Sequence, residues 1–262
     1  MPKAEQLAAD LQWLGLDWDE GGLEPEYCQS QRTAHYQVAF DKLAAAGLVY
    51  PCFCSRAERL AVASVSAPHL GENTSVQSCP CCNLSTAEQA EKIASGRRPA
   101  WRVRVPDEEV RLLDDNMGEY RENLAADCGD FIIKRSDGVF AYQLAVVVDD
   151  ALMRVNRVVR GRDLLSSTPR QIWLHRMLGS EPPSFCHVPL LLSAEGRRLA
   201  KRDHSLDMEA LRQRYTAPQL IGGLAWLAGW QSMPRPAWPQ DLLAGFDWQQ
   251  VGREDILLNG LL

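Results

Sequence analysis

The spacing of apolar residues predicts four helices and a largely helical part after Leu206. In each predicted helix the apolar side chains recur every three or four residues, which places them on one face. The predicted helices span residues 2–14, 33–46, 167–178 and 218–228. Each is followed by a glycine that can adopt the left-handed conformation typical of a helix end: Gly15, Gly47, Gly179 and Gly229.

Shorter apolar runs predict strands. From Trp101 to Val105 the apolar residues alternate with Arg102 and Arg104, which is typical of a half-buried strand with a basic outer row. Further strands are predicted at residues 49–54, 131–133, 139–148, 155–159 and 188–192. Residues 55–96 are polar and show no clear period in their middle, so something other than apolar packing must organise this segment.

Composition and charge exclude several classes of protein. Of the 262 residues, 46% are hydrophobic and 24% charged, which is typical of a folded globule and not of a disordered chain or a coiled coil. A net charge of -6 argues against wholesale electrostatic wrapping of nucleic acid, although it is compatible with a local basic groove.

Sequence features also bear on the compartment. No apolar run reaches the roughly 18 residues that a membrane span needs, and the first residues lack the basic-then-apolar layout of a signal peptide. We therefore expect a cytoplasmic protein with no membrane partner. Cysteines stay reduced in that compartment, so a cluster among the eight present indicates metal binding or catalysis more than disulfides.

Two groups of cysteines bracket the polar segment. Cys52 and Cys54 precede it, and after 24 residues Cys79 and Cys81 follow, with Cys82 directly after them. Four thiolates at about 2.3 Å from a Zn²⁺ ion close a tetrahedral site and leave no position open for catalysis, so such a site is structural. The alternative is a set of buried small side chains or a redox cluster. Zinc is favoured because the polar segment has too few apolar residues to fold by packing alone.

Two further groups of residues suggest ligand binding. The loop Arg198-Leu199-Ala200-Lys201-Arg202 carries closely spaced cations that suit a triphosphate, although basic loops are more often solvated surface. Arg160 ends a predicted strand and can hold a carboxylate bidentately, with the hydroxyl of Tyr142 on the same ligand. In the alternative interpretation Arg160 forms a structural ion pair with Asp149, Asp150 or Asp163.

Taken in order, these segments resemble the catalytic core of class I glutamyl-tRNA synthetases, and most closely the short glutamyl-queuosine tRNA(Asp) synthetases. The resemblance covers nearly the whole chain. Only 60 residues follow Arg202, too few for the large helical anticodon-binding part of the full-length enzymes. The cysteine-bounded module is also typical of the short branch. The matching stretches are residues 11–19, Tyr27 with Gln29-Ser30-Gln31-Arg32, residues 140–150, residues 158–161 running on to Thr168-Pro169-Arg170-Gln171, and residues 198–202 in place of a Lys-Met-Ser-Lys-Ser-type loop.

The resemblance implies an α/β fold with a class I, Rossmann-like core. It implies an N-terminally incomplete core, an inserted zinc-binding α+β module and a short helical C-terminal part. The corresponding divisions are a remnant of the first nucleotide-binding half at 1–48, a zinc-containing acceptor-binding module at 49–125, the second half of the core at 126–192, and a signature-loop and helical segment at 193–262.

The resemblance also implies an activity and its residues. Family members activate L-glutamate with ATP and Mg²⁺ and transfer it to queuosine of tRNA(Asp). Tyr142 and Arg160 would bind glutamate, and Lys201 would bind ATP as the catalytic lysine of a loop in which Ala200 replaces a common Ser. Cys52, Cys54 and Cys81 would be zinc ligands. Gln77 stands where the family usually supplies a Tyr ligand, so we expect Cys79 to replace it, and we expect a monomer.

One departure from the family affects the expected activity. The family's first strand and its His-x-Gly-His element have no counterpart in this sequence, and without them the grip on the ATP phosphates is weakened. We therefore expect this chain to be inactive or nearly so. Two alternatives stay open: a non-catalytic, zinc-containing tRNA-binding remnant, and a fragment of an ordinary glutamyl-tRNA synthetase that charges the tRNA 3′ end.

Overall fold

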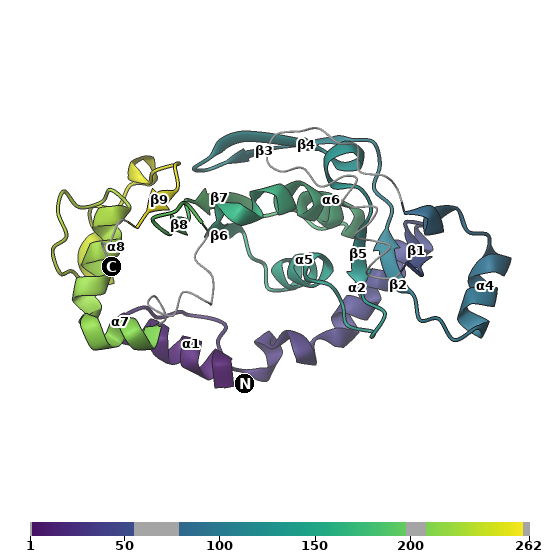
Figure 1. Ribbon diagram of the computed structural model, residues 1–262, viewed down its shortest axis with the longest axis horizontal. Helices are drawn as coiled ribbons and strands as arrows, with labels where there is room; N and C mark the ends of the chain where they lie inside the picture. The colour runs from purple at the N-terminus through teal and green to yellow at the C-terminus, as the bar shows by residue number, and fades with distance from the viewer. Residues whose placement is uncertain (1, 55–78, 198–207, 259–262) are drawn as a thin grey trace.

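The computed structural model describes residues 2–54, 79–197 and 208–258 (Figure 1). Its helices are α1 (Pro2–Trp13), α2 (Thr33–Ala45), α4 (Thr86–Ala94), α5 (Tyr142–Leu152), α6 (Thr168–Leu178), α7 (Met208–Arg214), α8 (Ala217–Leu227) and α9 (Pro239–Leu243). Its strands are β1 (Val49–Cys52), β2 (Ala100–Val103), β3 (Glu109–Asp114), β4 (Gly118–Asn123), β5 (Phe131–Lys134), β6 (Arg157–Gly161), β7 (Ser184–Val188), β8 (Leu191–Leu192) and β9 (Ile256–Leu257). The four predicted helices are confirmed to within a few residues.

A parallel β6–α6–β7 unit forms the centre of the molecule. Strands β6 and β7 pair in parallel, with Arg160 opposite His187. Pro169 occupies the first turn of α6, where its missing N–H costs nothing, and Gly179 ends the helix at φ 72°. Both strands present their carboxyl ends to the same edge, which is where open α/β sheets bind ligands.

The main core lies between α2, α5 and α6. Helices α2 and α5 each bury one face, α6 is buried around most of its circumference, and the fully buried side chains include Leu43, Leu144 and Trp173. The strand predicted at residues 139–148 is wrong, because this segment forms α5. The buried residues of α5 are Leu144, Ala145, Val147, Val148 and Asp149, a helical spacing that packing imposes on β-branched residues that favour strands.

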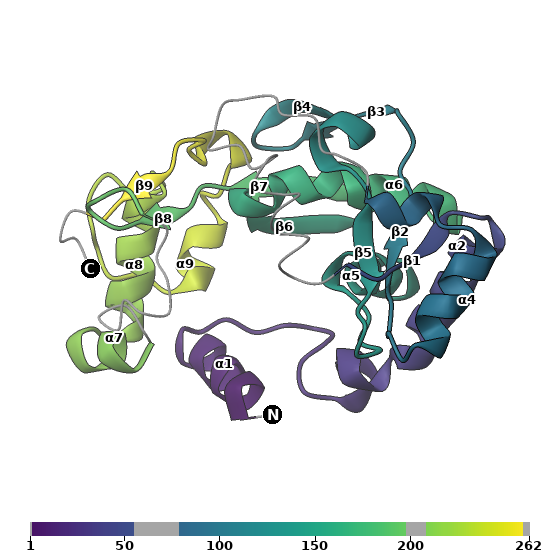
Figure 2. The ribbon, with the colours of Figure 1, turned by 45° about the vertical axis from the view of Figure 1, so that its right-hand side comes forward.

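An antiparallel sheet has the strand order β1-β2-β5, and Cys52 is the last residue of β1 (Figure 2). Val49 pairs with Val103 and Cys52 with Ala100, so β1 ends where the cysteines begin. In both views β1, β2 and α4 lie at one end of the molecule and α7 and α8 at the other. Helix α4 begins with a capping box in which Ser85 and Glu88 bond each other's backbone N–H groups.

The β3–β4 hairpin docks on the edge of β7. Asp114 pairs with Gly118 at the hairpin turn, and the backbone N–H of Asp115 donates to the carbonyl of Phe185 at 2.9 Å. In Figures 1 and 2 the hairpin lies along α6 and β7 on the side opposite α5. This docking brings the side chain of Asp114, at the end of β3, into contact with His187 of β7.

The first helical segment packs against α7 and α8 in a separate apolar cluster. Leu14 of the first helical segment packs with Leu211, Leu220 and Ile221 of α7 and α8. Arg212 forms an ion pair with Asp10 at 2.7 Å.

The strand predicted at 188–192 is largely wrong. Strand β7 ends at Val188, before Pro189, which has no N–H to donate, and β8 contains only two residues, paired with β9. None of the helices in the described ranges is long and apolar enough to cross a membrane.

Gly222 lies where α8 touches the chain that follows it. A Cβ atom at this position would lie 1.8 Å from the carbonyl oxygen of Arg235, so the two segments would have to separate. We expect Gly222→Ala to lower the free energy of unfolding by about 2 to 3 kcal/mol in urea titrations. Gly245→Ala is the control, since a Cβ atom there meets nothing within 4 Å. Equal stability of the two variants would contradict the contact.

His175 is buried in α6 and makes stability depend on pH. Burial lowers its pKa from about 6.5 to about 4, so between these values only the unfolded chain binds the proton. The stabilisation is therefore complete above about pH 6.5 and is lost as the pH falls towards about 4. We expect a loss of about 2 to 3 kcal/mol over this window. In His175→Gln the loss should shrink, and an unchanged pH profile would exclude His175 as its source.

Candidate active site and metal centre

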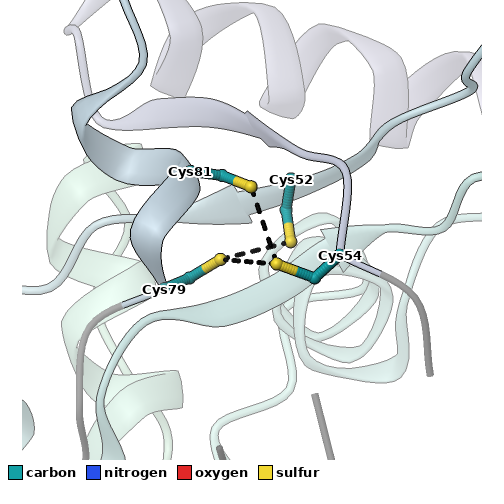
Figure 3. A group of neighbouring side chains, drawn as sticks. All are labelled: Cys52, Cys54, Cys79 and Cys81. Carbon is teal, nitrogen blue, oxygen red and sulfur yellow. Dashed lines mark hydrogen bonds between the residues drawn. The ribbon is translucent and has the colours of Figure 1, made fainter. Parts of the chain in front are cut away.

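Four cysteine side chains converge at the end of β1 (Figure 3). Cys52 is the last residue of β1, and Cys54 follows two residues later. Cys79 is the N-cap of the short helix η3 (Pro80–Asn83), and Cys81 lies within that helix. All four Sγ atoms lie within 4.8 Å of one another. The contacts of Cys79 with Cys52 and Cys54 are 3.4 and 3.5 Å, and that of Cys54 with Cys81 is 3.6 Å.

This geometry fits a tetrahedral zinc ion. Four sulfurs at about 2.3 Å from a central ion are separated by roughly 3.8 Å, close to the observed distances, whereas a disulfide needs about 2.05 Å. The backbone N–H of Phe53 donates to Cys81 Sγ at 3.4 Å, as it would to a thiolate. Burial raises the pKa of Cys54 to about 11 and that of Cys79 further, whereas hydrogen bonds, that of the Phe53 N–H first among them, outweigh burial and lower the pKa of Cys81.

The cysteine cluster is joined to the rest of the sheet by polar contacts. The Tyr50 hydroxyl donates to Asp130 at 2.8 Å, and the same carboxylate accepts the N–H of Val105 at 3.0 Å. Arg104 donates to the carbonyl of Cys82 at 2.8 Å, and Arg102 to the carbonyl of Asp130. The two arginines of the predicted basic row therefore each bind a carbonyl of this chain, and Arg102 is half-buried.

Arg160 lies near the carboxyl end of β6 with its guanidinium held on two sides. Its Nε donates to His187 Nε2 at 3.0 Å, and its Nη2 donates to Thr168 Oγ1 at 2.8 Å. The guanidinium carbon sits 5.1 Å from the ring centre of Phe185, which shields it from water. Bonds through Nε and Nη2 fix the plane of the fork, which can then meet a carboxylate edge-on.

Tyr142 shares this site. It is the first residue of α5 and is 47% exposed, and its phenol lies close enough to Arg160 to interact with the guanidinium. Burial lowers the pKa of Arg160, and the nearby Tyr142 hydroxyl and Asp150 carboxylate offset part of that effect. Tyr142 and Arg160 were predicted to bind the same ligand, and the structure brings the two together, although Tyr142 begins a helix instead of lying on a strand.

Asp149 and Asp150, two of the carboxylates considered as structural partners of Arg160, contact different residues. Asp149 is bound by Arg32 at 2.6 Å, by the Tyr36 hydroxyl at 2.8 Å and by Gln29 at 3.0 Å. It therefore ties α5 to the start of α2. For Asp150, burial raises the pKa to about 6, with Arg160 opposing the shift. Asp150 therefore lies close enough to Arg160 for the two charges to interact.

Several residues of the site were not singled out from the sequence. His187 and Asp114 lie directly behind Arg160, and Thr168 completes its surroundings. Thr168 and Arg32 belong to stretches on which the family resemblance rests, so the resemblance could have identified both residues. The loop Arg198-Leu199-Ala200-Lys201-Arg202 lies outside the described residues. The turn before it is described, with Ser193 and Arg197 paired through their backbones and Gly196 at φ 73°.

Comparison with known proteins gives related sequences. A sequence profile described as the catalytic domain of class I tRNA synthetases (E and Q) matches residues 2–235. The chain is 46% identical over 260 residues to a glutamyl-Q tRNA(Asp) synthetase from Symbiobacterium thermophilum, a match covering 97% of this chain and 79% of that protein. It is 50% identical over 232 residues to a protein of the same name from Nitratidesulfovibrio vulgaris, covering 86% and 71%.

A solved structure gives the same fold. A glutamate tRNA ligase from Elizabethkingia meningosepticum, in complex with its amino acid, superposes with a TM-score of 0.78 at 22% identity. The match covers 97% of this chain and 57% of that protein, so the chain spans little more than half of that ligase. At this identity the likeness concerns the fold alone.

Proposed function

The chain belongs to the class I tRNA synthetases for E and Q, alongside the glutamyl-Q tRNA(Asp) synthetases, and from this premise we propose that it activates L-glutamate with ATP and transfers it to queuosine of tRNA(Asp). The proposed partners are glutamate, ATP with Mg²⁺, and tRNA(Asp) carrying queuosine. The proposal takes the chain to act as a monomer in the cytoplasm.

The pairing of Arg160 with Tyr142 is the observation that carries this proposal. A guanidinium at the carboxyl end of a parallel strand, shielded by Phe185 and flanked by the phenol of a partly exposed tyrosine, suits a carboxylate ligand. Because the guanidinium is partly removed from water, its attraction for a carboxylate is stronger than at an open surface. Glutamate offers a carboxylate for this site and a second one for reaction.

Activation would join the second carboxylate to ATP. A carboxylate oxygen attacks the α-phosphorus in line and pyrophosphate leaves, so positioning and charge stabilisation lower the barrier and no covalent enzyme intermediate is needed. We propose that Lys201 binds the ATP phosphates. The loop that carries it follows directly on the described turn at Ser193–Arg197, beyond β8.

The cysteine cluster would hold one structural zinc ion through Cys52, Cys54, Cys79 and Cys81. A closed Cys₄ site contributes folding free energy and leaves no position for substrate. Its proposed role is to fasten η3 to the end of β1, so that the module at 49–125 presents a fixed surface to the acceptor RNA.

Glutamate binding, pyrophosphate exchange and acceptor identity test the proposal. We expect L-glutamate, and not L-glutamine or L-aspartate, to bind and to support exchange of pyrophosphate into ATP. The exchange rate separately tests the expectation of weak turnover. Radiolabelled glutamate should enter tRNA(Asp) that contains queuosine and spare tRNA(Asp) from cells that lack it.

The alternatives predict other outcomes. A fragment of an ordinary glutamyl-tRNA synthetase would label tRNA(Glu) and would not distinguish the two tRNA(Asp) preparations. A non-catalytic remnant would retain tRNA with steep salt dependence and bind neither glutamate nor ATP. Either pattern would overturn the proposed reaction.

A further inference from the structure

Two buried residues hold Arg160 from the side opposite its ligand. His187 Nε2 accepts from Arg160 Nε, and His187 Nδ1 lies 2.6 Å from Asp114 Oδ2. The side chains of His187 and Asp114 are both 0% exposed. The three groups form a continuous line from the turn of the β3–β4 hairpin, through β7, to β6.

The chemistry of the three groups fixes the proton positions in this line. An arginine side chain only donates hydrogen bonds, so Nε2 of His187 must accept and carries no proton. The proton of the neutral imidazole then resides on Nδ1 and is donated to Asp114. Burial is the largest influence on the pKa of His187 and lowers it; Asp114 raises the pKa and Arg160 lowers it, and the net direction is downwards, which favours the neutral ring.

Asp114 is itself held in one orientation. Its Oδ1 accepts three backbone N–H groups, those of Asn116, Met117 and His187, at 3.1, 2.8 and 3.0 Å. Oδ2 is therefore the oxygen that faces the imidazole. Burial raises the pKa of Asp114, but the hydrogen bonds outweigh it and bring the pKa below its usual value, so the group is a carboxylate. Its negative charge compensates the guanidinium through the neutral ring.

We infer that Asp114 and His187 are positioning residues for Arg160, which orient its guanidinium for the substrate carboxylate and balance its buried charge. Together with Thr168 at Nη2, they leave the guanidinium one orientation about its long side chain. The inference rests on the proposed function for its substrate, but the hydrogen-bond line itself is a property of the free protein.

The isosteric variant Asp114→Asn tests the inference. Oδ1 of the asparagine can still accept hydrogen bonds from the three backbone N–H groups. The amide –NH₂ then lies against His187 Nδ1. The imidazole must then accept at Nδ1 and carry its proton on Nε2, where it opposes the N–H of Arg160. We expect the KM for glutamate to rise about 10- to 100-fold, with the KM for ATP and the zinc content unchanged.

Asp115→Asn is the matched control, because Asp115 lies on the same turn and pairs with Arg157, outside the line. It should leave the KM for glutamate at the wild-type value. Nitrogen-15 NMR of the histidines, with His187→Phe for assignment, reads the tautomer without any substrate. A proton on Nε2 in the wild-type protein overturns the inference whatever the enzyme does.

The outcomes separate the inference from the proposed function. A wild-type protein with the expected tautomer that fails to bind glutamate contradicts the proposed substrate and, with it, the substrate part of the inference. A wild-type protein that binds glutamate while Asp114→Asn binds it equally well overturns the positioning role alone. A raised KM for glutamate in Asp114→Asn but not in Asp115→Asn supports it.

Discussion

Replacing Arg160 with lysine is expected to weaken glutamate binding by about 100- to 1,000-fold. Lysine keeps the positive charge but loses the planar fork, so it cannot hold His187 and Thr168 and meet a carboxylate with two parallel hydrogen bonds. It also leaves His187 Nε2 buried without its donor, and an unsatisfied buried polar atom costs about 1 to 3 kcal/mol. Calorimetric titration with L-glutamate measures the affinity, and pyrophosphate exchange measures kcat/KM.

The matched control for this variant is Arg157→Lys. Arg157 lies on the same strand, but its side chain is exposed and pairs with Asp115 at the surface. Exposed pairs contribute little, so glutamate binding should stay within about twofold of the wild-type value. If Arg160→Lys bound glutamate as tightly as Arg157→Lys, the carboxylate site would have to lie elsewhere.

Loss of the metal is expected to unfold the cysteine-bounded module while the main core persists. Binding of structural zinc to thiolates contributes about 10 to 16 kcal/mol in small zinc domains, and the apolar cluster around Tyr50 and Phe53 is too small to replace it. Cys79→Ser should therefore lose stoichiometric zinc. Hydrogen exchange should accelerate in η3 and α4 while α5 and α6 remain protected.

Cys82→Ser provides the control for the metal prediction. Cys82 is adjacent to Cys81, but its thiol contacts Asn83 and lies outside the four-sulfur cluster. This variant should retain one zinc ion per chain by elemental analysis and the wild-type melting temperature. A Cys79→Ser protein that kept both would remove Cys79 from the ligand set.

The sequence predicted those features that depend on local periodicity or close spacing. The helices ending at Gly15, Gly47 and Gly179 follow from their apolar period and a following glycine, and each glycine has a positive φ. The cysteine cluster follows from two short motifs, because each motif can place two thiols close together. The roles of these cysteines, of Tyr142 and of Lys201 stay predictions, as does the division of the chain at residues 48, 125 and 192.

Other features depend on contacts between distant segments. The run at 139–148 is apolar enough for either a strand or a helix, and its packing against α2 and α6 decides for a helix. The contact between His187 and Asp114 joins residues 73 positions apart. This contact exists because the turn of the β3–β4 hairpin docks on β7. The residues around Asp114 contain no local pattern that predicts this docking.

The cysteine cluster also limits where the sequence is free to change. Cys54 and Cys79 stand at the two ends of the 24-residue insertion, and the cluster holds those ends together. Because each end carries sulfurs of the cluster, a substitution that shifted β1 against η3 would separate atoms that lie within 4.8 Å of one another. The relative placement of these two flanks is therefore a constraint on the sequence, in addition to the register of β1 against β2.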